Sequence, residues 1–232
     1  LRGENKMIYI TGDIHGPIDI HKLNKRYFDD TNLTKDDYLI ICGDFGLVWD
    51  NSPKEKFWLD WLNEKNYTTL FIDGNHENFS ILNSYPVETW NGGKVHRISD
   101  SVLHLMRGQV FTIDNRTFFT MGGAASVDKN WRTPGISWWP EEMPSDEEYI
   151  EANLNLYNYE NEVDYIITHT APTSIVNQLI PEIKPPDRLT DFLEDIKKSV
   201  KYKHWYFGHF HDDQDIDEKH TLLYYNIIPL EG

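Results

Sequence analysis

The 232-residue sequence has one cysteine, Cys42, and lacks any run of 18 or more apolar residues. A single cysteine excludes a disulfide within the chain and favours a reducing compartment. Without a long apolar run no segment is suited to cross a membrane, and no signal-peptide pattern is present. These absences predict a soluble, cytoplasmic protein without membrane partners. Because Cys42 ends an apolar run, we expect a buried, unreactive thiol.

Positive charge is also scarce, with 22 Lys and Arg against 38 Asp and Glu and a formal net charge of −16. A strongly acidic surface is repelled by other polyanions, which disfavours nucleic acids and anionic membranes as partners. Bound divalent cations would still make one cleft locally positive, so a small anionic substrate remains compatible with this charge. No Gly-x-Gly-x-x-Gly turn follows the first strand-like run, which argues against a metal-free nucleotide-binding protein of the α/β class.

The composition is that of a globular protein, 39% hydrophobic and 14% aromatic. No internal repeat, low-complexity tract or linker divides the chain, so we expect one domain over residues 7–232. Residues 1–6, which precede an internal Met7, are interpreted as an upstream or cloning remnant. The sequence does not determine the oligomeric state.

In the first part of the chain, strand-like and helix-like segments alternate, which favours a parallel sheet with right-handed crossovers. Three short strands joined by tight turns follow a loop-like stretch and suggest an antiparallel meander. The expected strands are 8–11, 38–42, 68–72, 102–105, 109–113, 117–121, 163–168, 202–207 and one or two within 221–228. The expected helices begin at Pro17, Ser52, Ser145 and Thr190, the expected loop is 84–97, and a stiff connector is expected over 181–186.

Polar side chains of the kinds that bind metals follow five of these strands, in most cases beside a glycine. Glycine gives the backbone dihedral angles that other residues avoid, so it can direct neighbouring side chains into one space. The carboxyl ends of parallel strands meet at one edge of a sheet, so these side chains should converge. The five turns are Gly12-Asp13-Ile14-His15, Gly43-Asp44-Phe45-Gly46, Gly74-Asn75-His76-Glu77, Thr168-His169 and Gly208-His209-Phe210-His211.

The converging side chains form a plausible ligand set for two metal ions. Imidazole together with carboxylate and amide suits Mn²⁺, iron or Zn²⁺ better than Mg²⁺ or Ca²⁺. A structural imidazole is the ordinary explanation for any one histidine, but it does not explain ligand chemistry at five strand ends. Seven ligands exceed one tetrahedral site, so one carboxylate should bridge two ions. Between these ions a hydroxide nucleophile could form for an in-line displacement. The predicted ligands are Asp13, His15, Asp44, Asn75, His169, His209 and His211.

His76 directly follows one of these ligands and is available as a general acid for the leaving oxygen. Candidate substrate-binding residues are Arg132, close to Ser126 and Asp128, and Arg107, although a solvated surface arginine is the common alternative for both. Trp138 and Trp139 belong to a long irregular segment and could form a lid, a stacking platform or a subunit contact.

The five turns, in this order, resemble the motifs of the calcineurin-like metallophosphoesterase superfamily. This resemblance extends over nearly the whole chain. It implies an α/β fold: a four-layer α-β-β-α sandwich of two mixed β-sheets flanked by helices. It also implies hydrolysis of a phosphate mono- or diester, with Asp44 as the bridging ligand and His76 as the proton donor. One metal would be held by Asp13, His15, Asp44 and His211, and the other by Asp44, Asn75, His169 and His209.

The second turn departs from the Ser/Thr protein phosphatase branch, because Leu47 and Val48 replace its acid and its phosphate-binding arginine. This argues against phosphoprotein phosphatase activity, while the paired histidines of the last turn resemble the phosphodiesterase side of the superfamily. The expected substrate is therefore a small phosphodiester or nucleotide, with Mn²⁺ as the first choice of metal and iron or Zn²⁺ as alternatives. A non-catalytic metal-binding scaffold with the same fold is the rival from another class, although no ligand is missing.

Overall fold

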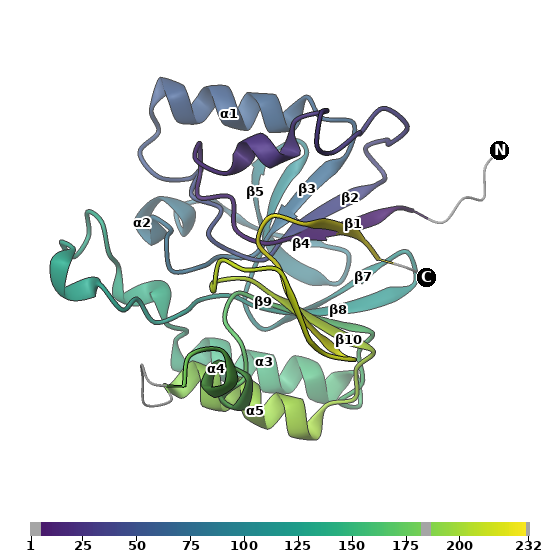
Figure 1. Cartoon of the computed structure of the whole chain (residues 1–232), viewed down its shortest axis with the longest axis vertical. Helices are drawn as coiled ribbons and strands as arrows, with labels where there is room; N and C mark the ends of the chain where they lie inside the picture. Colours follow the sequence, from purple (N-terminus) through teal and green to yellow (C-terminus); the bar gives the residue numbers. More distant parts are fainter. Residues whose placement is uncertain (1–5, 182–186, 231–232) are drawn as a thin grey trace.

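The computed structural model describes residues 6–181 and 187–230, and in it two β-sheets pack face to face between two layers of helices (Figure 1). The predicted four-layer sandwich of two mixed sheets is confirmed. Most of the expected connector 181–186, and all but one residue of the expected remnant 1–6, lie outside the described residues. No helix in the described ranges is long and apolar enough to cross a membrane.

The first sheet has seven strands in the order β13-β1-β2-β3-β6-β5-β4. Its four central strands are parallel, and β13, β5 and β4 run antiparallel to their neighbours. The strands are β1 (Ile8–Thr11), β2 (Tyr38–Ile41), β3 (Thr68–Phe71), β4 (Val87–Trp90), β5 (Gly93–Ser99), β6 (Val102–Leu105) and β13 (Ile227–Pro229).

The second sheet has six strands in the order β11-β12-β10-β9-β8-β7. Here β8, β9, β10 and β12 are parallel, and the edge strands β7 and β11 are antiparallel to their neighbours. The strands are β7 (Gln109–Ile113), β8 (Arg116–Met121), β9 (Tyr165–Thr168), β10 (His204–Phe207), β11 (Gln214–Asp217) and β12 (His220–Leu222).

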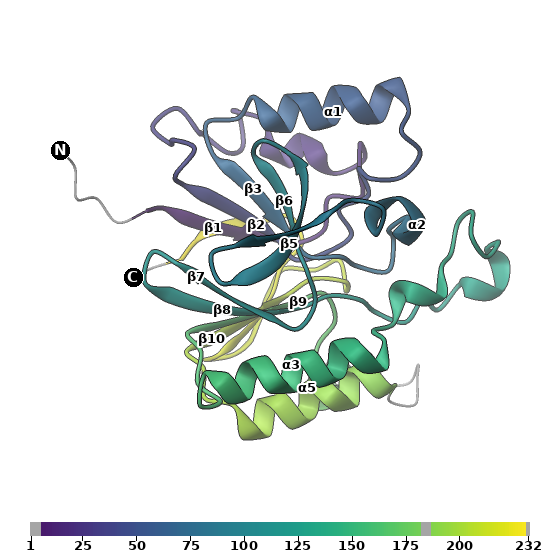
Figure 2. The same ribbon diagram turned by 180° about the vertical axis from the view of Figure 1, so that it is seen from behind.

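The helices cover the outer faces of the two sheets (Figures 1 and 2). On the first sheet lie η1 (Ile20–Leu23) and α1 (Pro53–Asn63), with α2 (Phe79–Leu82) beside them. On the second lie α3 (Asp146–Asn158), α4 (Thr173–Leu179) and α5 (Arg188–Ser199). The predicted starts of α1 and α3 are confirmed, because Ser52 and Ser145 each accept a hydrogen bond from the backbone three residues on.

The hydrophobic core has three parts, one between the sheets and one under each layer of helices. The central strands of the first sheet are buried on both faces. In β2, for example, Ile40 packs between the sheets, while Leu39 and Ile41 pack beneath the outer helices. This explains why such strands are continuous apolar runs. Cys42 is fully buried at the end of β2, as predicted, and burial raises the pKa of its thiol.

Three expectations about local structure are wrong. Residues 84–97 are not a loop but contain β4 and much of β5, a hairpin whose first strand is exposed or half-buried and whose turn is formed by Asn91 and Gly92 with positive φ. Of the expected meander only the antiparallel pair β7–β8 forms, because β6 pairs in parallel with β3 in the first sheet while β7 and β8 belong to the second. The helix expected after Pro17 is reduced to turns and η1.

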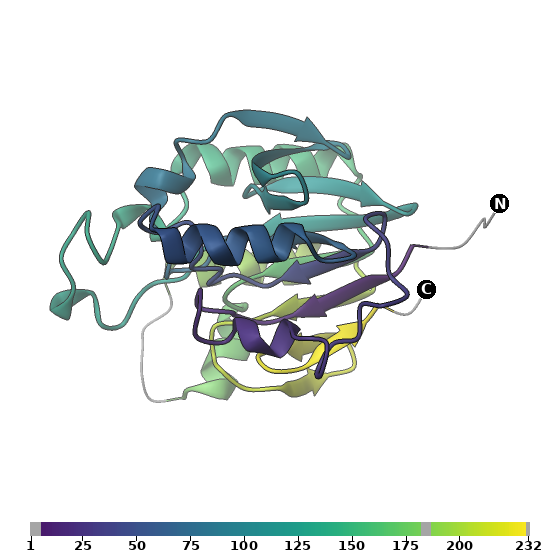
Figure 3. The same ribbon diagram turned by 90° about the horizontal axis from the view of Figure 1, so that it is seen from above.

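The segment between β8 and α3 projects from the body of the molecule beyond the strand ends (Figures 1 and 3). It contains the short helices η2 (Lys129–Trp131) and η3 (Pro140–Glu142). Trp139 is buried and holds this segment against the body of the molecule. Its ring packs edge-on against Trp49, and its Nε1 donates to Oγ of Ser80. Trp131 is 92% exposed. Trp139 therefore anchors this segment, a role that differs from the lid, stacking platform or subunit contact considered for the Trp pair.

Candidate metal centre

The predicted ligands follow the carboxyl ends of parallel strands from both sheets: β1, β2 and β3 of the first, and β9 and β10 of the second. Four of them have a left-handed backbone, namely His15, Asp44, His209 and His211, with φ between 42° and 72°. This conformation costs about 1–3 kcal/mol for a residue other than glycine and is concentrated at functional sites. The local strain therefore marks this edge of the sandwich as a site.

Four ligands surround one position. Asp13, His15, Asp44 and His211 each offer an atom, and these atoms all lie within 4.8 Å of one another. Oδ2 of Asp13 is buried without a hydrogen-bond partner among the described residues and lies 3.4 Å from Nε2 of His211. A buried carboxylate oxygen with no donor is unfavourable unless a cation compensates it. The donor set, two carboxylates and two imidazoles, fits a first-row divalent ion.

The remaining ligands surround a second position beside the first. Nε2 of His169 lies 3.3 Å from Oδ1 of Asp44 and 3.2 Å from Oδ1 of Asn75. Nδ1 of His169 is 2.8 Å from the Cys42 carbonyl oxygen, to which it must donate, so Nε2 is the nitrogen that can bind a metal. The His209 ring centroid is 5.0 Å from that of His169. All seven predicted ligands are thus brought together.

Asp44 lies between the two positions. Its Oδ2 is 3.3 Å from Nε2 of His15, which belongs to the first group, while its Oδ1 faces His169 of the second. The carboxylate is 1% exposed and also accepts the backbone N–H of His76 at 2.7 Å. One carboxylate that offers a separate oxygen to each group is what a bridging ligand requires.

Several residues that sequence analysis missed hold the first group in place. Oδ2 of Asp19 is 3.0 Å from Nδ1 of His15 and also accepts the Tyr224 hydroxyl at 3.0 Å, and the Tyr224 ring stacks on His211. Lys22 donates to the backbone carbonyl oxygen of Asp13 at 2.8 Å. A carboxylate behind a ligating histidine fixes the ring and raises its basicity. Asp19 follows His15 by four residues and could have been suspected, whereas nothing in the sequence indicates Tyr224.

Glu77 connects the loops that contain Asp44 and Asn75. It is 1% exposed and accepts the backbone N–H groups of Phe45 at 2.7 Å and Gly46 at 3.1 Å. Burial, and then the charge of Asp44, raise the pKa of Glu77 to about 8. Its role is therefore to position the backbone around the ligands.

Of the predicted substrate-binding residues, Arg132 lies at the metal centre. Its Nη2 is 3.0 Å from Nε2 of His76, and its Nε donates to Asp128 at 2.8 Å. Because a guanidinium only donates, Nε2 of His76 must accept this bond and is unprotonated. Burial lowers the pKa of His76, and Arg132 lowers it further against the attraction of Asp44.

Arg107 lies behind Asn75 rather than among the ligands. It is 5% exposed, and its Nε and Nη2 donate to Oδ2 of Asp73 at 2.8 and 2.5 Å. Its Nη2 also lies 3.4 Å from the Glu142 carbonyl oxygen. The Glu142 carboxylate accepts the Ser126 N–H, and Oγ of Ser126 accepts from the Asn75 amide. Together with the backbone between Asp73 and Asn75, these contacts form a closed network that holds the Asn75 side chain in position.

The electrostatics of the ligands favour positive charge. Burial opposes the charged form of His169, yet the carboxylates of Asp44 and Asp13 outweigh it and raise the pKa of His169 to about 10. Burial opposes the charged form of His15 as well, and Asp44 is again the largest influence that raises its pKa. A site that holds protons this tightly is suited to divalent cations.

Comparison with known proteins agrees with this chemistry. The family model described as calcineurin-like phosphoesterase matches residues 6–213. The chain belongs to the calcineurin-like phosphoesterase family. The predicted resemblance is confirmed, and with it the prediction of a metal-dependent phosphoric ester hydrolase.

Two further comparisons add detail. No curated protein matches this phosphoesterase. Among solved structures it is similar to the crystal structure of phosphopantetheinyl hydrolase from Mycobacterium tuberculosis, with 14% sequence identity and a TM-score of 0.45. That similarity covers 97% of this chain and 91% of the other.

Metal binding to this phosphoesterase should release protons and weaken as the pH falls. His169, with its pKa raised to about 10, is protonated at neutral pH without metal and must lose that proton to bind an ion. We expect the apparent affinity for Mn²⁺ to fall about tenfold per pH unit for each proton released. Calorimetry in two buffers of different ionisation enthalpy measures the proton count. Equal affinities at pH 6 and pH 8, without proton release, would contradict this prediction.

Replacement of Arg107 should destabilise the phosphoesterase fold. Arg107→Met leaves the buried Asp73 carboxylate without its cation, so the free energy of unfolding should fall by about 3–5 kcal/mol in urea titrations. The matched control is Arg97→Met, which removes a half-exposed pair with Glu88 and should cost less than about 1 kcal/mol. If Arg107→Met instead kept its stability and raised only KM, Arg107 would be a substrate-binding residue, as the sequence predicts.

Proposed function

We propose that this phosphoesterase hydrolyses small phosphodiesters or nucleotide-like phosphate esters with a pair of Mn²⁺ ions, for which iron or Zn²⁺ could substitute. The observation that supports two ions is Asp44, whose two oxygens face separate groups of donors. Two cations held this way supply Lewis-acid chemistry that lowers the pKa of water and compensates charge on the phosphate oxygens. Asp13, His15 and His211 would hold one ion with Asp44, and Asn75, His169 and His209 the other.

The side chains beside the ligands suggest how the phosphate is bound and how the leaving group departs. Arg132 is bonded to His76, and a phosphate oxygen is a stronger acceptor for its guanidinium than an imidazole. When a substrate binds, the Arg132 guanidinium would therefore exchange its hydrogen bond with His76 for one with a phosphate oxygen. The negative charge of the substrate favours protonation of the freed imidazole, which then donates its proton to the ester oxygen as the P–O bond breaks.

Two alternatives are less well supported. A phosphoprotein phosphatase of the Ser/Thr type would need an acid and a phosphate-binding arginine where this chain has Leu47 and Val48, and both side chains are only 1% exposed in the core. A non-catalytic scaffold would be expected to have lost ligands, whereas all seven lie at one edge of the sandwich. The acidic net charge of −16 also favours a small substrate over nucleic acid.

A metal-by-substrate panel tests the proposal. Mn²⁺, Fe²⁺, Zn²⁺ and Mg²⁺ would each be added to metal-free protein with nitrophenyl mono- and diesters and cyclic nucleotides. We expect Mn²⁺ to support the fastest diester hydrolysis. Arg132→Ala should raise KM about tenfold because a charged hydrogen bond to phosphate is lost.

Lys129→Ala, an exposed cation on the same segment, is the matched control and should leave KM unchanged. Hydrolysis confined to monoesters would overturn the proposed substrate class. An unchanged KM in Arg132→Ala would remove Arg132 from the binding site.

A further inference from the structure

The ring of Tyr224, in the turn between β12 and β13, orients one ligand of the first group directly. It stacks on the imidazole of His211, with the ring centroids 4.8 Å apart and the planes 19° from parallel. Because the His211 side chain is 51% exposed, it has more rotational freedom to lose on metal binding than a buried ligand. The stack on Tyr224 restricts that freedom before an ion binds.

The hydroxyl of Tyr224 reaches a second ligand through Asp19. It donates to Oδ2 of Asp19 at 3.0 Å, and the same oxygen lies 3.0 Å from Nδ1 of His15. A carboxylate only accepts, so it directs the Nδ1–H of His15 towards itself and leaves Nε2 facing the metal position. The hydroxyl therefore holds the carboxylate that orients His15.

The backbone of Tyr224 is joined to the loop of a third ligand, Asp13. Nζ of Lys22 donates to the carbonyl oxygens of Gly12, Asp13 and Tyr224. The two segments are so close that a Cβ atom at Gly12 would overlap the Leu223 carbonyl oxygen, so only glycine fits there. The turn after β12 is thus packed directly onto the turn that contains Asp13.

Asp213 fixes this turn from the loop that contains His211. Its carboxylate accepts the backbone N–H groups of Tyr224 at 2.8 Å, Tyr225 at 3.0 Å and Asn226 at 3.1 Å. A backbone bonded at three successive residues has a defined position. The Tyr224 side chain is therefore held in place before it contacts His211.

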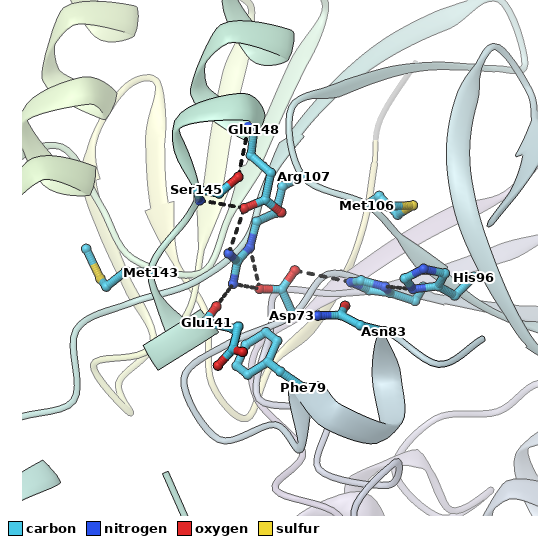
Figure 4. Close-up of a pocket in the computed structure, with 11 residues that line it drawn as sticks. Asp73, Phe79, Asn83, His96, Met106, Arg107, Glu141, Met143, Ser145 and Glu148 are labelled. Carbon is cyan, nitrogen blue, oxygen red and sulfur yellow. Dashed lines mark hydrogen bonds and ion pairs between the residues drawn. The ribbon is translucent and has the colours of Figure 1, made fainter. Parts of the chain in front are cut away.

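The second group of ligands is supported by contacts that do not involve Tyr224. Arg107, which Figure 4 shows bonded to Asp73 and Glu148, belongs to the network behind Asn75. Within residues 6–181 and 187–230, the hydrogen bonds and ring contacts of Tyr224 join it to none of these residues. A change at Tyr224 should therefore affect one ion position and not the other.

We propose that Tyr224 is a positioning residue for the first metal ion, an inference that rests on the proposed function because it assumes two ions. Its ring orients His211, and its hydroxyl orients His15 through Asp19. Its backbone keeps the Asp13 loop beside both. Ligands that are already oriented lose less conformational entropy when an ion binds, so the ion is bound more tightly.

Titration with Zn²⁺ of protein containing ¹⁵N-labelled histidine distinguishes the two positions. The ring nitrogens of His15 and His211 report on the first ion, and those of His169 and His209 on the second. We expect Tyr224→Leu to weaken binding at the first position by about 10–100-fold, the effect typical of residues behind metal ligands. Binding at the second position should stay nearly unchanged.

Two conservative variants separate the hydroxyl from the ring, and they test the proposal even if Tyr224→Leu does not fold. Tyr224→Phe keeps the stack on His211 and loses only the bond to Asp19, so its loss of first-ion affinity should be smaller, about tenfold. Asp19→Asn acts on the same connection, so the effects of the two substitutions should not add. The matched control is Tyr157→Leu, at a tyrosine in α3 that is 73% exposed, and it should alter neither position.

An equal loss at both positions would overturn the proposal, because Tyr224 would then support only the fold. Unchanged first-ion affinity in Tyr224→Leu, or fully additive effects of Tyr224→Phe and Asp19→Asn, would also overturn it. Two ions bound with unaltered affinities in Tyr224→Leu would leave the proposed function intact and refute this inference alone. Saturation of a single position in the unaltered protein would contradict the two-ion function itself, and this inference with it.

Discussion

Replacement of Asp44 by asparagine should reduce turnover by roughly 10³-fold or more, since changes behind a metal ligand alone cost 10–100-fold. The variant loses one negative charge that faces both groups of ligands and offers a single neutral oxygen in place of two charged ones. The fold should persist, because asparagine tolerates the left-handed backbone of position 44, where φ is 46°.

The measurement is kcat/KM for a nitrophenyl phosphodiester at saturating Mn²⁺, together with bound metal and circular dichroism. Asp114→Asn is a matched control, because Asp114 also has a left-handed backbone, with φ of 51°, but lies in the turn between β7 and β8. Its activity should equal that of the unaltered protein. Turnover at the normal rate in Asp44→Asn would exclude a bridging role.

Replacement of His76 by alanine should have an effect that depends on the leaving group. An alkyl ester leaves as a strong base and needs a proton, so its hydrolysis should slow by about 10²–10⁴-fold without the general acid. A nitrophenolate is a weak base that leaves without protonation, and its rate should fall by less than about tenfold. His21→Ala, on an exposed histidine, should alter neither rate.

Rates on the two leaving groups would be compared under identical metal saturation. If His76→Ala slowed both substrates by the same factor, His76 would act by position or charge and not as a proton donor. The hydrogen bond from the His76 backbone to Asp44 involves only the main chain, so the substitution leaves it in place.

The strands that could be predicted from the sequence are those buried on both faces. In β2 and β3 every side chain is buried, so the apolar run itself specifies the strand. The hairpin of β4 and β5 was missed because its first strand is exposed or half-buried and has few apolar residues, although its Asn91-Gly92 turn is a recognisable signal. The assignment of β6 to the first sheet could not be predicted. The short turn between β6 and β7 suggests that these two strands pair with each other, whereas in the fold β6 pairs with β3 and β7 belongs to the second sheet.

The candidate site likewise contains residues whose place is set by local sequence and residues whose place is set by tertiary packing. The ligands could be predicted because each follows its strand directly, so its place is set by local sequence. Of the residues that support them, Asp19 lies only four positions from His15, but Tyr224 and Arg107 could not be assigned because their partners are distant in the chain. Tyr224 reaches Asp19 across 205 positions, and Arg107 reaches Asp73 across 34. Arg107 was proposed for its charge alone, whereas its burial against Asp73 is decided by tertiary structure.

The ligand groups draw on both sheets, from Asp13 near the start of the chain to His211 late in it. During synthesis on the ribosome, therefore, the centre cannot be completed until β10 has emerged and docked. Until that point a nascent chain would lack the capacity to cleave phosphate esters, and metallation would follow the docking of β10.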